Sequence, residues 1–412
     1  MIRAMPATIR TIRADEFEAF VAAAHTAYFQ TDPVAEDAAR RLPHTDLERA
    51  YAAYDDNDRI VGTLRSFATE MTVPGDRQLP VAALSYVAVM PTHRRRGLLR
   101  GMLSADLAAC RDRGEVASIL IASEYRIYGR FGYGPAIDEA TWTIDARRTA
   151  VRGESVGSVE FVSVEDARQL LPDVYDRVRL RRPGEIARWD MRWDLNLGVV
   201  ELPGRPGWKG WVVVHRDRGG RPDGYLRYHV EDLWIDRVPA STLIVDELAG
   251  ATPSVEADLW RFALEVDLIA TVRAPGRSRD DILPWLLTDR RAAKLTQLDD
   301  FVWLRILDVP AFLGGRAYDR EGSLVIEVTD EMGLAGGRYA LEASPDGADC
   351  RPTNASPGLT MPIGVLGSAV LGGVSLRTLA DAGHLDVHDP SALATADAVL
   401  RWPVTPWCST WF

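Results

Sequence analysis

One stretch of the chain, Leu84–Arg100, reads in order as a buried strand, a short turn, three adjacent arginines and the start of an amphipathic helix. This order brings the guanidinium groups and the backbone N–H groups of a helix N-terminus around one point, which suits a pyrophosphate. The helix is expected over 97–113, with its apolar residues on one face. Taken alone, the stretch also fits an ordinary strand-to-helix turn with an exposed basic edge.

Size and composition limit the classes of protein that this chain can represent. With 412 residues it is too long for one hydrophobic core, so two to four domains are expected. A formal net charge of −11 argues against non-specific nucleic-acid binding and favours a cationic substrate over an anionic one. The three cysteines and seven histidines show no disulfide framework and no metal-binding spacing, so no metal is predicted. The start of the chain carries arginines but no apolar run, which predicts a cytoplasmic protein.

One long uncharged segment tests whether the chain crosses a membrane. Residues 352–376 carry no formal charge and are numerous enough to span a bilayer. The segment contains Pro362 and several glycines but no solid apolar block. We therefore expect a short buried strand followed by a glycine-rich turn and a helix, and no membrane contact.

Hydrophobic periodicity divides the chain into three units. The first 145 or so residues predict an α/β sandwich around a mixed sheet, with strands at 8–12, 51–54, 59–73, 79–90 and 117–122 and helices at 14–29 and 97–113. A second unit begins near Gly153 and predicts strands at 211–215, 225–230, 242–248 and 268–272 and helices at 165–179 and 254–265. It repeats the order of the first unit without an arginine–glycine turn, which suggests a degenerate duplicate. A third unit starts near Asp308, with strands at 323–328 and 337–342 and helices at 363–371, 375–382 and 390–401.

A second cluster of interest covers 122–136. Its Gly129, Gly132 and Gly134 imitate a dinucleotide fingerprint, but no strand leads directly into them and no helix follows Pro135. We instead expect a strand end, a short helix over 125–130 and a tight turn. The phenol of Tyr128 could protonate a leaving thiolate there. Core packing with a satisfied hydroxyl is the alternative for any single tyrosine.

The two clusters together resemble a known family. The Val87-Ala88-Val89 strand followed by an Arg-x-x-Gly-x-Leu turn is similar to the acetyl-CoA motif of the GNAT N-acetyltransferases, although most members have glycine or alanine in place of Leu99. The longer strings 87–100 and 127–136 resemble the Eis (enhanced intracellular survival) branch, in which the leucine is normal. The resemblance extends over 287–293 and 301–311 to the terminal Trp411-Phe412.

The resemblance implies an architecture and an activity. The fold would be α/β (α+β), with two tandem GNAT-like mixed-sheet domains, 1–150 and 151–300, followed by a sterol-carrier-protein-like α+β domain, 301–412. The activity would be acetyl-CoA-dependent N-acetyl transfer to primary amines of a polycationic small molecule of aminoglycoside type, by direct attack in a ternary complex. The assembly would be a homo-hexamer built from two trimers. The alternatives are a protein lysine or polyamine acetyltransferase and a non-catalytic lipid- or ligand-binding protein.

The resemblance also assigns site residues. Tyr128 would be the general acid, and the α-carboxylate of Phe412 would act as base or orient the amine. The acetyl-CoA contacts would be Val87, Ala88, Val89, Arg94, Arg95, Arg96, Gly97, Leu98, Leu99, Arg100, Ser123 and Glu124, with amides of the strand polarising the thioester carbonyl. Tyr125 and Arg126 depart from the small residues that the family often has. Candidates for an amine pocket are Tyr28, Phe29, Asp32, Glu36 and Asp37, for each of which a solvated helix face is the alternative.

Overall fold

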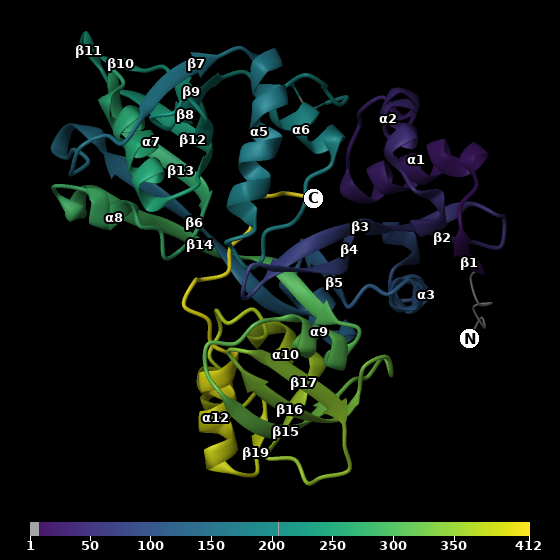
Figure 1. The fold of residues 1–412 in the computed structure, drawn as a ribbon. Coiled ribbons are helices and arrows are strands. Elements are labelled where there is room, and N and C mark those ends of the chain that lie inside the picture. Colours follow the sequence, from purple (N-terminus) through teal and green to yellow (C-terminus); the bar gives the residue numbers. More distant parts are fainter. Residues whose placement is uncertain (1–7, 205) are drawn as a thin grey trace.

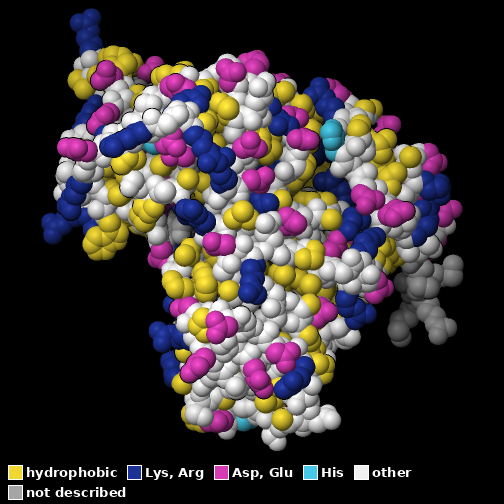
Figure 2. All heavy atoms as spheres, viewed as in Figure 1, with side chains coloured by type: hydrophobic (Ala, Val, Ile, Leu, Met, Phe, Trp, Pro, Cys, Tyr) yellow, Lys and Arg dark blue, Asp and Glu magenta, His cyan; other side chains and the backbone are white. Residues whose placement is uncertain are grey.

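The computed structural model describes residues 8–204 and 206–412, which form one twelve-stranded sheet, a separate five-stranded sheet and the helices around them (Figure 1). The start of the predicted first domain, and most of the stretch read for a targeting signal, lie outside the described residues. In the view of Figure 2, acidic and basic side chains are interspersed over the surface of the molecule.

The N-terminal half has the predicted order of strands and helices. Its strands are β1 (Thr8–Thr11), β2 (Ala50–Tyr54), β3 (Ile60–Val73), β4 (Arg77–Val89), β5 (Ala117–Ile121) and β6 (Gly134–Asp145). Its helices are α1 (Phe17–Tyr28), α2 (Val34–Arg41), α3 (Leu98–Asp112) and the short α4 (Tyr125–Tyr128). Helices α1 and α3 both pack on β3 and β4, but they bury two separate apolar clusters, so they cover opposite faces of the sheet. The sequence analysis predicted neither α2 nor β6. In the case of β6, the glycines and the proline at its start indicated only a turn.

The second half continues the same sheet. Its strands are β7 (Ser158–Val162), β8 (Trp211–Arg216), β9 (Pro222–Glu231), β12 (Ser241–Gly250), β13 (Ile269–Arg277) and β14 (Ala293–Ile306), with a small hairpin of β10 (Trp234–Ile235) and β11 (Val238–Pro239). Its helices are α5 (Val164–Arg179), α6 (Asp190–Asn196), α7 (Pro253–Glu265) and α8 (Leu283–Leu286). The strand order across the whole sheet is β1-β2-β3-β4-β5-β14-β6-β13-β12-β9-β8-β7.

The two halves exchange strands at the middle of this sheet. β14, from the end of the second half, lies between β5 and β6 and pairs antiparallel with both. β6, from the end of the first half, pairs in turn with β13 of the second half. Each half therefore completes its sheet with a strand from the other. The predicted end of the second domain, residue 300, lies inside β14.

The C-terminal part forms the five-stranded sheet, in the order β17-β16-β15-β18-β19. Its elements are α9 (Val309–Gly315), β15 (Gly322–Thr329), β16 (Gly337–Ser344), β17 (Gly347–Pro352), β18 (Leu359–Pro362), α10 (Ile363–Ala369), α11 (Leu376–Asp381), β19 (Asp386–Val387) and α12 (Pro390–Leu400). Its apolar interior is continuous with that of the N-terminal half, because Met71, Val81, Leu324 and Leu366 belong to one buried cluster.

The uncharged segment 352–376 is explained by this packing. It forms β18 and α10, as expected, but two of its glycines lie inside the helix rather than in a turn. A Cβ on Gly364 would lie 2.8 Å from the carbonyl oxygen of Tyr133, and one on Gly367 would lie 2.4 Å from that of Leu304. Glycine is needed so that α10 can approach the sheet closely. Within the described residues, no helix is long and apolar enough to cross a membrane.

After α12 the chain turns back towards the large sheet. Residues 401–412, called the C-terminal tail below, contain no regular helix or strand in the structure. The tail leaves the C-terminal domain and ends between α5 and α6 on one side and α1 and α2 on the other (Figure 1). The chain end thus reaches the N-terminal half of the large sheet.

Candidate active site

The site begins where β4 and β5 separate. The two strands run parallel and pair only at Val81–Ala117, Ala82–Ser118 and Ala83–Ile119. Beyond Ala83, β4 keeps its pairing with β3 but loses β5. The opening that results is called the β4–β5 splay below.

A bulge in β4 interrupts the regular pairing of this strand next to the splay. The register between β3 and β4 shifts between Thr63 and Arg65, and Tyr86 in the opposing part of β4 takes a left-handed conformation (φ 56°). Met90 donates its backbone N–H to the carbonyl oxygen of Val61 in β3 (2.9 Å). Because successive residues of a strand direct their N–H and C=O groups to opposite sides, those of Val87 and Val89 point away from β3, towards the splay. An extended ligand arm can pair with this edge like an added strand.

The turn after β4 presents its polar groups to the same opening. Arg95 (φ 63°) and Gly97 (φ 81°) are both left-handed, and α3 begins directly after Gly97 without a side-chain cap. No atom lies within 4 Å of a Cβ built on Gly97, so its backbone angle, not crowding, calls for glycine. The uncapped N–H groups of α3, its positive end and the exposed arginines fit a pyrophosphate.

The other predicted cofactor contacts differ in how far their side chains are exposed to solvent. Arg94, Arg95, Arg96 and Arg100 are exposed, as are Ser123 and Glu124. Leu98 is buried and Leu99 half-buried in the core beneath α3, so Leu98 offers a ligand only its backbone. The Arg100 guanidinium lies over the ring of Phe131 (5.5 Å), which fixes its direction.

Tyr128 lies at the end of α4, with its ring against that of Tyr133 (6.1 Å between centroids) and only 5% of the residue exposed. Burial raises the pKa of Tyr128, a hydrogen bond with Ser123 opposes the rise, and Glu124 adds to it. A raised pKa keeps the phenol protonated at neutral pH, which is the form that a proton donor needs.

A second phenol, that of Tyr28 in α1, lies at the same strand edge. The Tyr28 hydroxyl donates to the carbonyl oxygen of Val87 (2.8 Å), although 42% of the residue is exposed. Burial raises the pKa of Tyr28, and the neighbouring phenols of Tyr128 and Tyr86 raise it further. Tyr28 and Tyr128 therefore both lie at the β4–β5 splay.

The chain end lies on the face of the sheet that α1 and α2 cover. Ser66 of β3 bonds to Asp106 of α3 (2.6 Å), so the next side chain, Phe67, points to the opposite face. The ring of Phe412 packs edge-on against Phe67, with 6.1 Å between centroids. The tail thus crosses from the C-terminal domain to the N-terminal half of the large sheet.

The structure separates the five amine-pocket candidates. Asp37 is only 2% exposed and is held by Arg41 (2.7 Å) and His25 (3.0 Å), so it is an internal structural carboxylate and not a solvated one. Glu36 and Phe29 are exposed, and Asp32 is half-buried.

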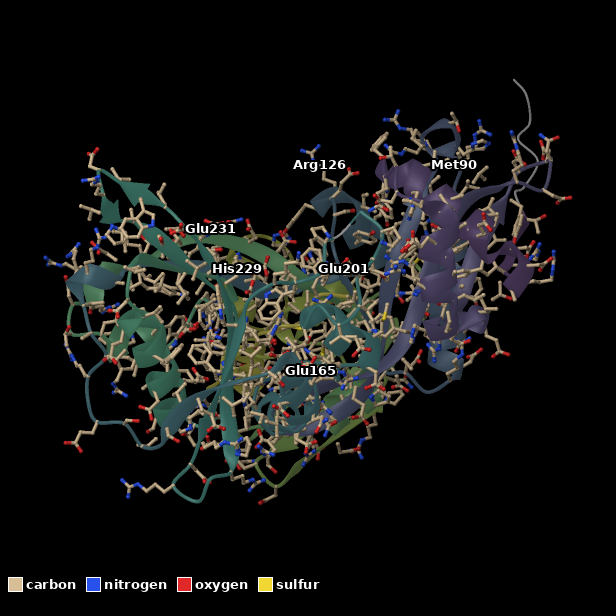
Figure 3. The ribbon with its side chains drawn as sticks, turned by 90° about the horizontal axis from the view of Figure 1, so that it is seen from above. Met90, Arg126, Glu165, Glu201, His229 and Glu231 are labelled. Atoms are coloured by element: carbon tan, nitrogen blue, oxygen red, sulfur yellow. The ribbon has the colours of Figure 1, made fainter. Side chains whose placement is uncertain are left out.

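Sequence reasoning missed one part of the same neighbourhood. Residues 199–208, of which Arg205 lies outside the described residues, reach from the second half to α2, where Arg40 donates to the carbonyl oxygen of Glu201. In Figure 3, seen from above, Glu201 lies between the helices of the N-terminal half and the strand that carries His229 and Glu231. Arg40 also bonds to Glu36 (2.7 Å), and the Asp32 carboxylate lies beside Gly204, so Asp32, Glu36 and Glu201 lie in one neighbourhood that their distance in sequence does not reveal.

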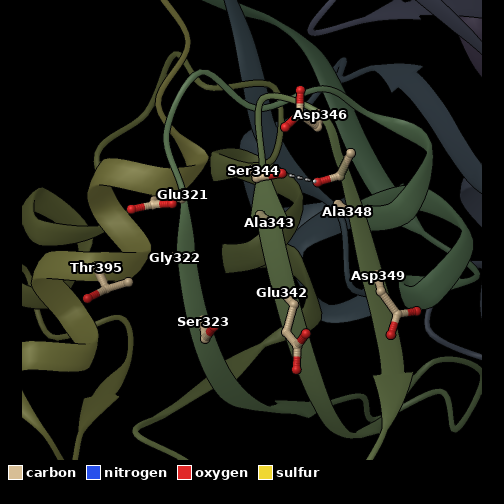
Figure 4. Close-up of a pocket in the computed structure, with 11 residues that line it drawn as sticks. Glu321, Gly322, Ser323, Glu342, Ala343, Ser344, Asp346, Ala348, Asp349 and Thr395 are labelled. Carbon is tan, nitrogen blue, oxygen red and sulfur yellow. Dashed lines mark hydrogen bonds between the residues drawn. The ribbon is translucent and has the colours of Figure 1, made fainter.

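A separate groove of about 840 Å³ lies on the C-terminal sheet (Figure 4). It is lined by β15, β16 and β17 and carries the carboxylates of Glu321, Glu342, Asp346 and Asp349. None of the predicted site residues lines it. Among the described residues, no group of three or more His, Cys, Asp and Glu side chains could hold a metal ion.

Comparison with known families agrees with this architecture. Residues 8–136 and residues 184–306 each match a family described as acetyltransferase (GNAT) domain, and residues 309–409 match the sterol carrier protein domain. The chain is therefore a GNAT N-acetyltransferase with a duplicated GNAT fold and a sterol-carrier-type domain.

Individual relatives narrow the assignment. An uncharacterized N-acetyltransferase of Streptomyces avermitilis is 40% identical over 98% of both chains, and the N-acetyltransferase Eis of Mycobacterium tuberculosis is 37% identical over 82% of both. The crystal structure of Eis1 from Mycobacterium abscessus superposes with a TM-score of 0.86 at 31% identity, covering 98% of this chain and 100% of the other. The chain belongs to the Eis family of GNAT N-acetyltransferases. A GNAT protein of Anabaena variabilis shares the fold at 18% identity (TM-score 0.84).

The family assignment confirms the predicted fold class and the predicted enzyme class. It also argues against the alternative of a non-catalytic binding protein. Membership of the GNAT class implies acetyl-CoA as the acyl donor.

Proposed function

We propose that this enzyme transfers an acetyl group from acetyl-CoA to a primary amine of a polycationic small molecule of aminoglycoside type. The observations that carry the proposal are the uncapped helix N-terminus and the buried phenol of Tyr128 at the β4–β5 splay, together with the packing of the chain end against Phe67 of β3. The bound donor supplies an acetyl thioester, and the amine attacks it directly in a ternary complex. Holding both reactants in one site contributes much of the rate enhancement.

The residues of the chain have separate roles in this scheme. Backbone N–H groups of Val87 and Val89 stabilise the negative charge that develops on the thioester oxygen when the amine nitrogen bonds to the carbonyl carbon. Tyr128 gives its proton to the sulfur as the carbon–sulfur bond breaks, and solvent restores that proton. Arg94–Arg96, Gly97 and the start of α3 bind the pyrophosphate, together with Leu98, Leu99, Arg100, Ser123 and Glu124 along the cofactor path.

The carboxylate of Phe412 receives or relays the proton that the amine loses. An α-carboxylate has an ordinary pKa of about 3.3–3.7, so it is a weak base towards an ammonium group. Its stronger contribution is to attract the amine and to hold it in line with the thioester. In either role it must lie at the acceptor side of the splay, and the contact of Phe412 with Phe67 supports that location.

Charge supports a polycationic acceptor. The chain carries a net charge of −11, and Asp32, Glu36 and Glu201 lie close to one another around Arg40 and the 199–208 segment. Acidic groups around a cleft raise the local concentration of a cation. The second candidate, a lysine side chain of a protein or a linear polyamine, has the same reacting group but a different shape.

A panel of acceptors separates these candidates. Aminoglycosides, lysine peptides and spermidine are each offered with acetyl-CoA, and free thiol is measured as it is released. The proposal expects kcat/KM to be highest for aminoglycosides. A preference for lysine peptides or spermidine would replace the proposed substrate class.

We further propose that the enzyme assembles as a homo-hexamer of two trimers and acts in the cytoplasm. Supporting the first, the β10–β11 hairpin exposes Leu233, Trp234, Ile235 and Val238, each by 51–55% of its surface. Exposed apolar clusters of this kind mark protein interfaces. Supporting the second, all three cysteines are free, as in a reducing compartment. The proposed domain division is 1–150, 151–300 and 301–412.

A further inference from the structure

The second half contains a splay of its own. β12 and β13 run parallel and pair only from Ser241–Ile269 to Ile244–Arg273. The register between β12 and β9 then shifts between Val245 and Glu247, as the register of β4 shifts after its last pair with β5. The β12–β13 splay is therefore the counterpart of the opening that we assign to acetyl-CoA, on the duplicated fold.

This second splay is filled by side chains of the protein. Arg277 donates to the carbonyl oxygen of Leu248 in β12 (2.7 Å), where a ligand arm would pair, and forms an ion pair with Asp281 (2.7 Å). Trp407 of the C-terminal tail lies beside it, with its ring 5.1 Å from the Arg277 guanidinium and its Nε1 donating to Gly276 (3.0 Å). Both residues are nearly completely buried. The tail therefore enters the place that a cofactor would take.

The tail is then held by one short stretch, Pro183–Trp189, called the clamp segment below. The Trp407 N–H donates to the Pro183 carbonyl oxygen (2.9 Å). Glu185 accepts from the backbone N–H (3.1 Å) and the hydroxyl (2.7 Å) of Ser409. Arg188 donates to the hydroxyl oxygens of Ser409 (2.8 Å) and Thr410 (2.7 Å).

Arg188 is itself held by a residue of the β12–β13 splay. It forms an ion pair with Glu247 (2.7 Å), which follows the β12 bulge, and lies 3.9 Å from the centre of the Tyr175 ring. Burial acts to raise the pKa of Glu247, but the charges of Arg188 and Arg227 hold it below its ordinary value. Both side chains of the pair are nearly inaccessible to solvent, so the contacts that Arg188 makes to the tail are shielded from competition by water.

The clamp segment is also attached to the first half. Backbone hydrogen bonds join Gly184 and Glu185 to Thr72, and Ala187 to Glu70, all along β3 (2.8–2.9 Å). At its end, the Trp189 ring packs on Phe67 (4.7 Å), and Phe67 also contacts Phe412. The clamp segment thus connects the tail to β3, the strand whose Phe67 contacts Phe412.

We infer that the duplicated GNAT fold has exchanged cofactor binding for a different role, in which its filled splay and the clamp segment position the C-terminal carboxylate for the reaction in the first half. Arg188 and Glu185 are positioning residues, which act on the amine only through the tail. This inference rests on the role proposed above for the Phe412 carboxylate.

The test removes the hydroxyl groups that the clamp segment holds and leaves the clamp itself intact. The variant Ser409→Ala/Thr410→Val is compared with Thr405→Val, which deletes a tail hydroxyl that bonds to Asp280 (2.6 Å) outside the clamp. Arg188→Lys serves as the conservative variant, since it keeps the charge opposite Glu247 and loses the fork of donors. Carboxypeptidase A measures the release of Phe412 and Trp411, and therefore the docking of the tail, without reference to activity.

We expect the double variant to release its terminal residues faster and to lose about tenfold to a hundredfold in kcat, with the dissociation constant for acetyl-CoA unchanged. Thr405→Val should match the parent in both measurements, and Arg188→Lys should fall between. In an enzyme with Gly-Ser appended after Phe412, the double variant should cause no further loss, because the pathway through the tail is already blocked.

The outcomes separate the two proposals. Unchanged carboxypeptidase release in the double variant overturns the clamp, whatever the activity. Faster release with unchanged kcat leaves the clamp holding the tail but refutes the role of the carboxylate in catalysis. A further loss of activity in the extended enzyme shows that these residues act by another route, which also overturns the inference.

Discussion

Replacing Tyr128 by phenylalanine tests the proposed general acid. The substitution removes one oxygen and leaves the ring, which packs on Tyr133, in place. The hydroxyl bonds to Ser123 at the edge of the splay, so its loss should lower the free energy of unfolding by about 0.5–1.5 kcal/mol at most. The neighbouring Tyr125→Phe is a matched control, because that ring is 64% exposed and packs on Trp303.

The effect on the rate should be much larger than the effect on stability. A positioned proton donor is worth about 10²–10⁴ in rate, or roughly 2.7–5.4 kcal/mol of activation free energy. Because burial raises the pKa of Tyr128, the wild-type enzyme should keep its donor protonated up to and beyond pH 10, the ordinary value for tyrosine. No alkaline loss of kcat below pH 10 should therefore come from this residue.

The assay is thiol release at saturating amine and acetyl-CoA, repeated with an acetyl thioester whose thiol is more acidic than that of CoA. An acidic thiol leaves without a proton, so the defect of Tyr128→Phe should shrink with the second donor. Wild-type turnover in Tyr128→Phe, or an equal defect with both thioesters, would refute the assignment of Tyr128 as the acid.

Three further substitutions test individual physical claims. Gly97→Ala keeps free space around the new Cβ but forces alanine to φ 81°, so it should cost about 1–2 kcal/mol and weaken acetyl-CoA binding in calorimetry, whereas Gly129→Ala should be neutral. Burial raises the pKa of Asp106 to about 6, so the buried charge of this carboxylate lowers the stability of the folded protein. The loss of stability is absent below about pH 4, where Asp106 is protonated in the folded and the unfolded state, and complete above pH 6. Asp106→Asn removes the charge and should therefore raise the melting temperature more at pH 7.5 than at pH 5. An equal rise at both pH values would contradict that pKa. Arg305→Met leaves Asp330 buried without its ion pair (2.8 Å) and should cost about 3–5 kcal/mol in denaturant unfolding, and a loss below 1 kcal/mol would contradict the role of that pair.

The parts of the molecule that the sequence predicted well are those fixed by local patterns. The turn at 94–99 and helix α3 follow from a glycine with φ 81° and from apolar spacing, both of which are visible in a short window. Four strands of the second half, β8, β9, β12 and β13, were likewise predicted to within about five residues, because their alternation is local, whereas β7 and the β10–β11 hairpin were not predicted.

The parts that the sequence did not predict depend on contacts between distant segments. β6 and β14 are exchanged between the halves, so neither completes a sheet with its own sequence neighbours. The sequence around Asp37 is typical of a solvated helix face, but the packing of α2 on α1 buries this carboxylate against His25. The link between Arg188 and Thr410 spans 222 positions, and no periodicity carries such a signal.

The same distinction applies within the active site. Its cofactor side is local and was predicted from one motif. Its proposed acceptor side combines α1, the 199–208 segment and the tail, and the proposal that the chain end belongs there came from the resemblance to a family alone.

The most direct test of the account removes the charge of the terminal carboxylate without changing the length of the chain. Cys408 allows a peptide Cys-Ser-Thr-Trp-Phe-amide to be joined to a protein thioester ending at Trp407, and the same ligation with the free acid provides the control. The measurement is kcat for a polycationic amine, with acetyl-CoA affinity measured in parallel. We predict a loss of about a hundredfold in kcat for the amide, with acetyl-CoA affinity unchanged. Equal turnover by the amide and the free acid would contradict it.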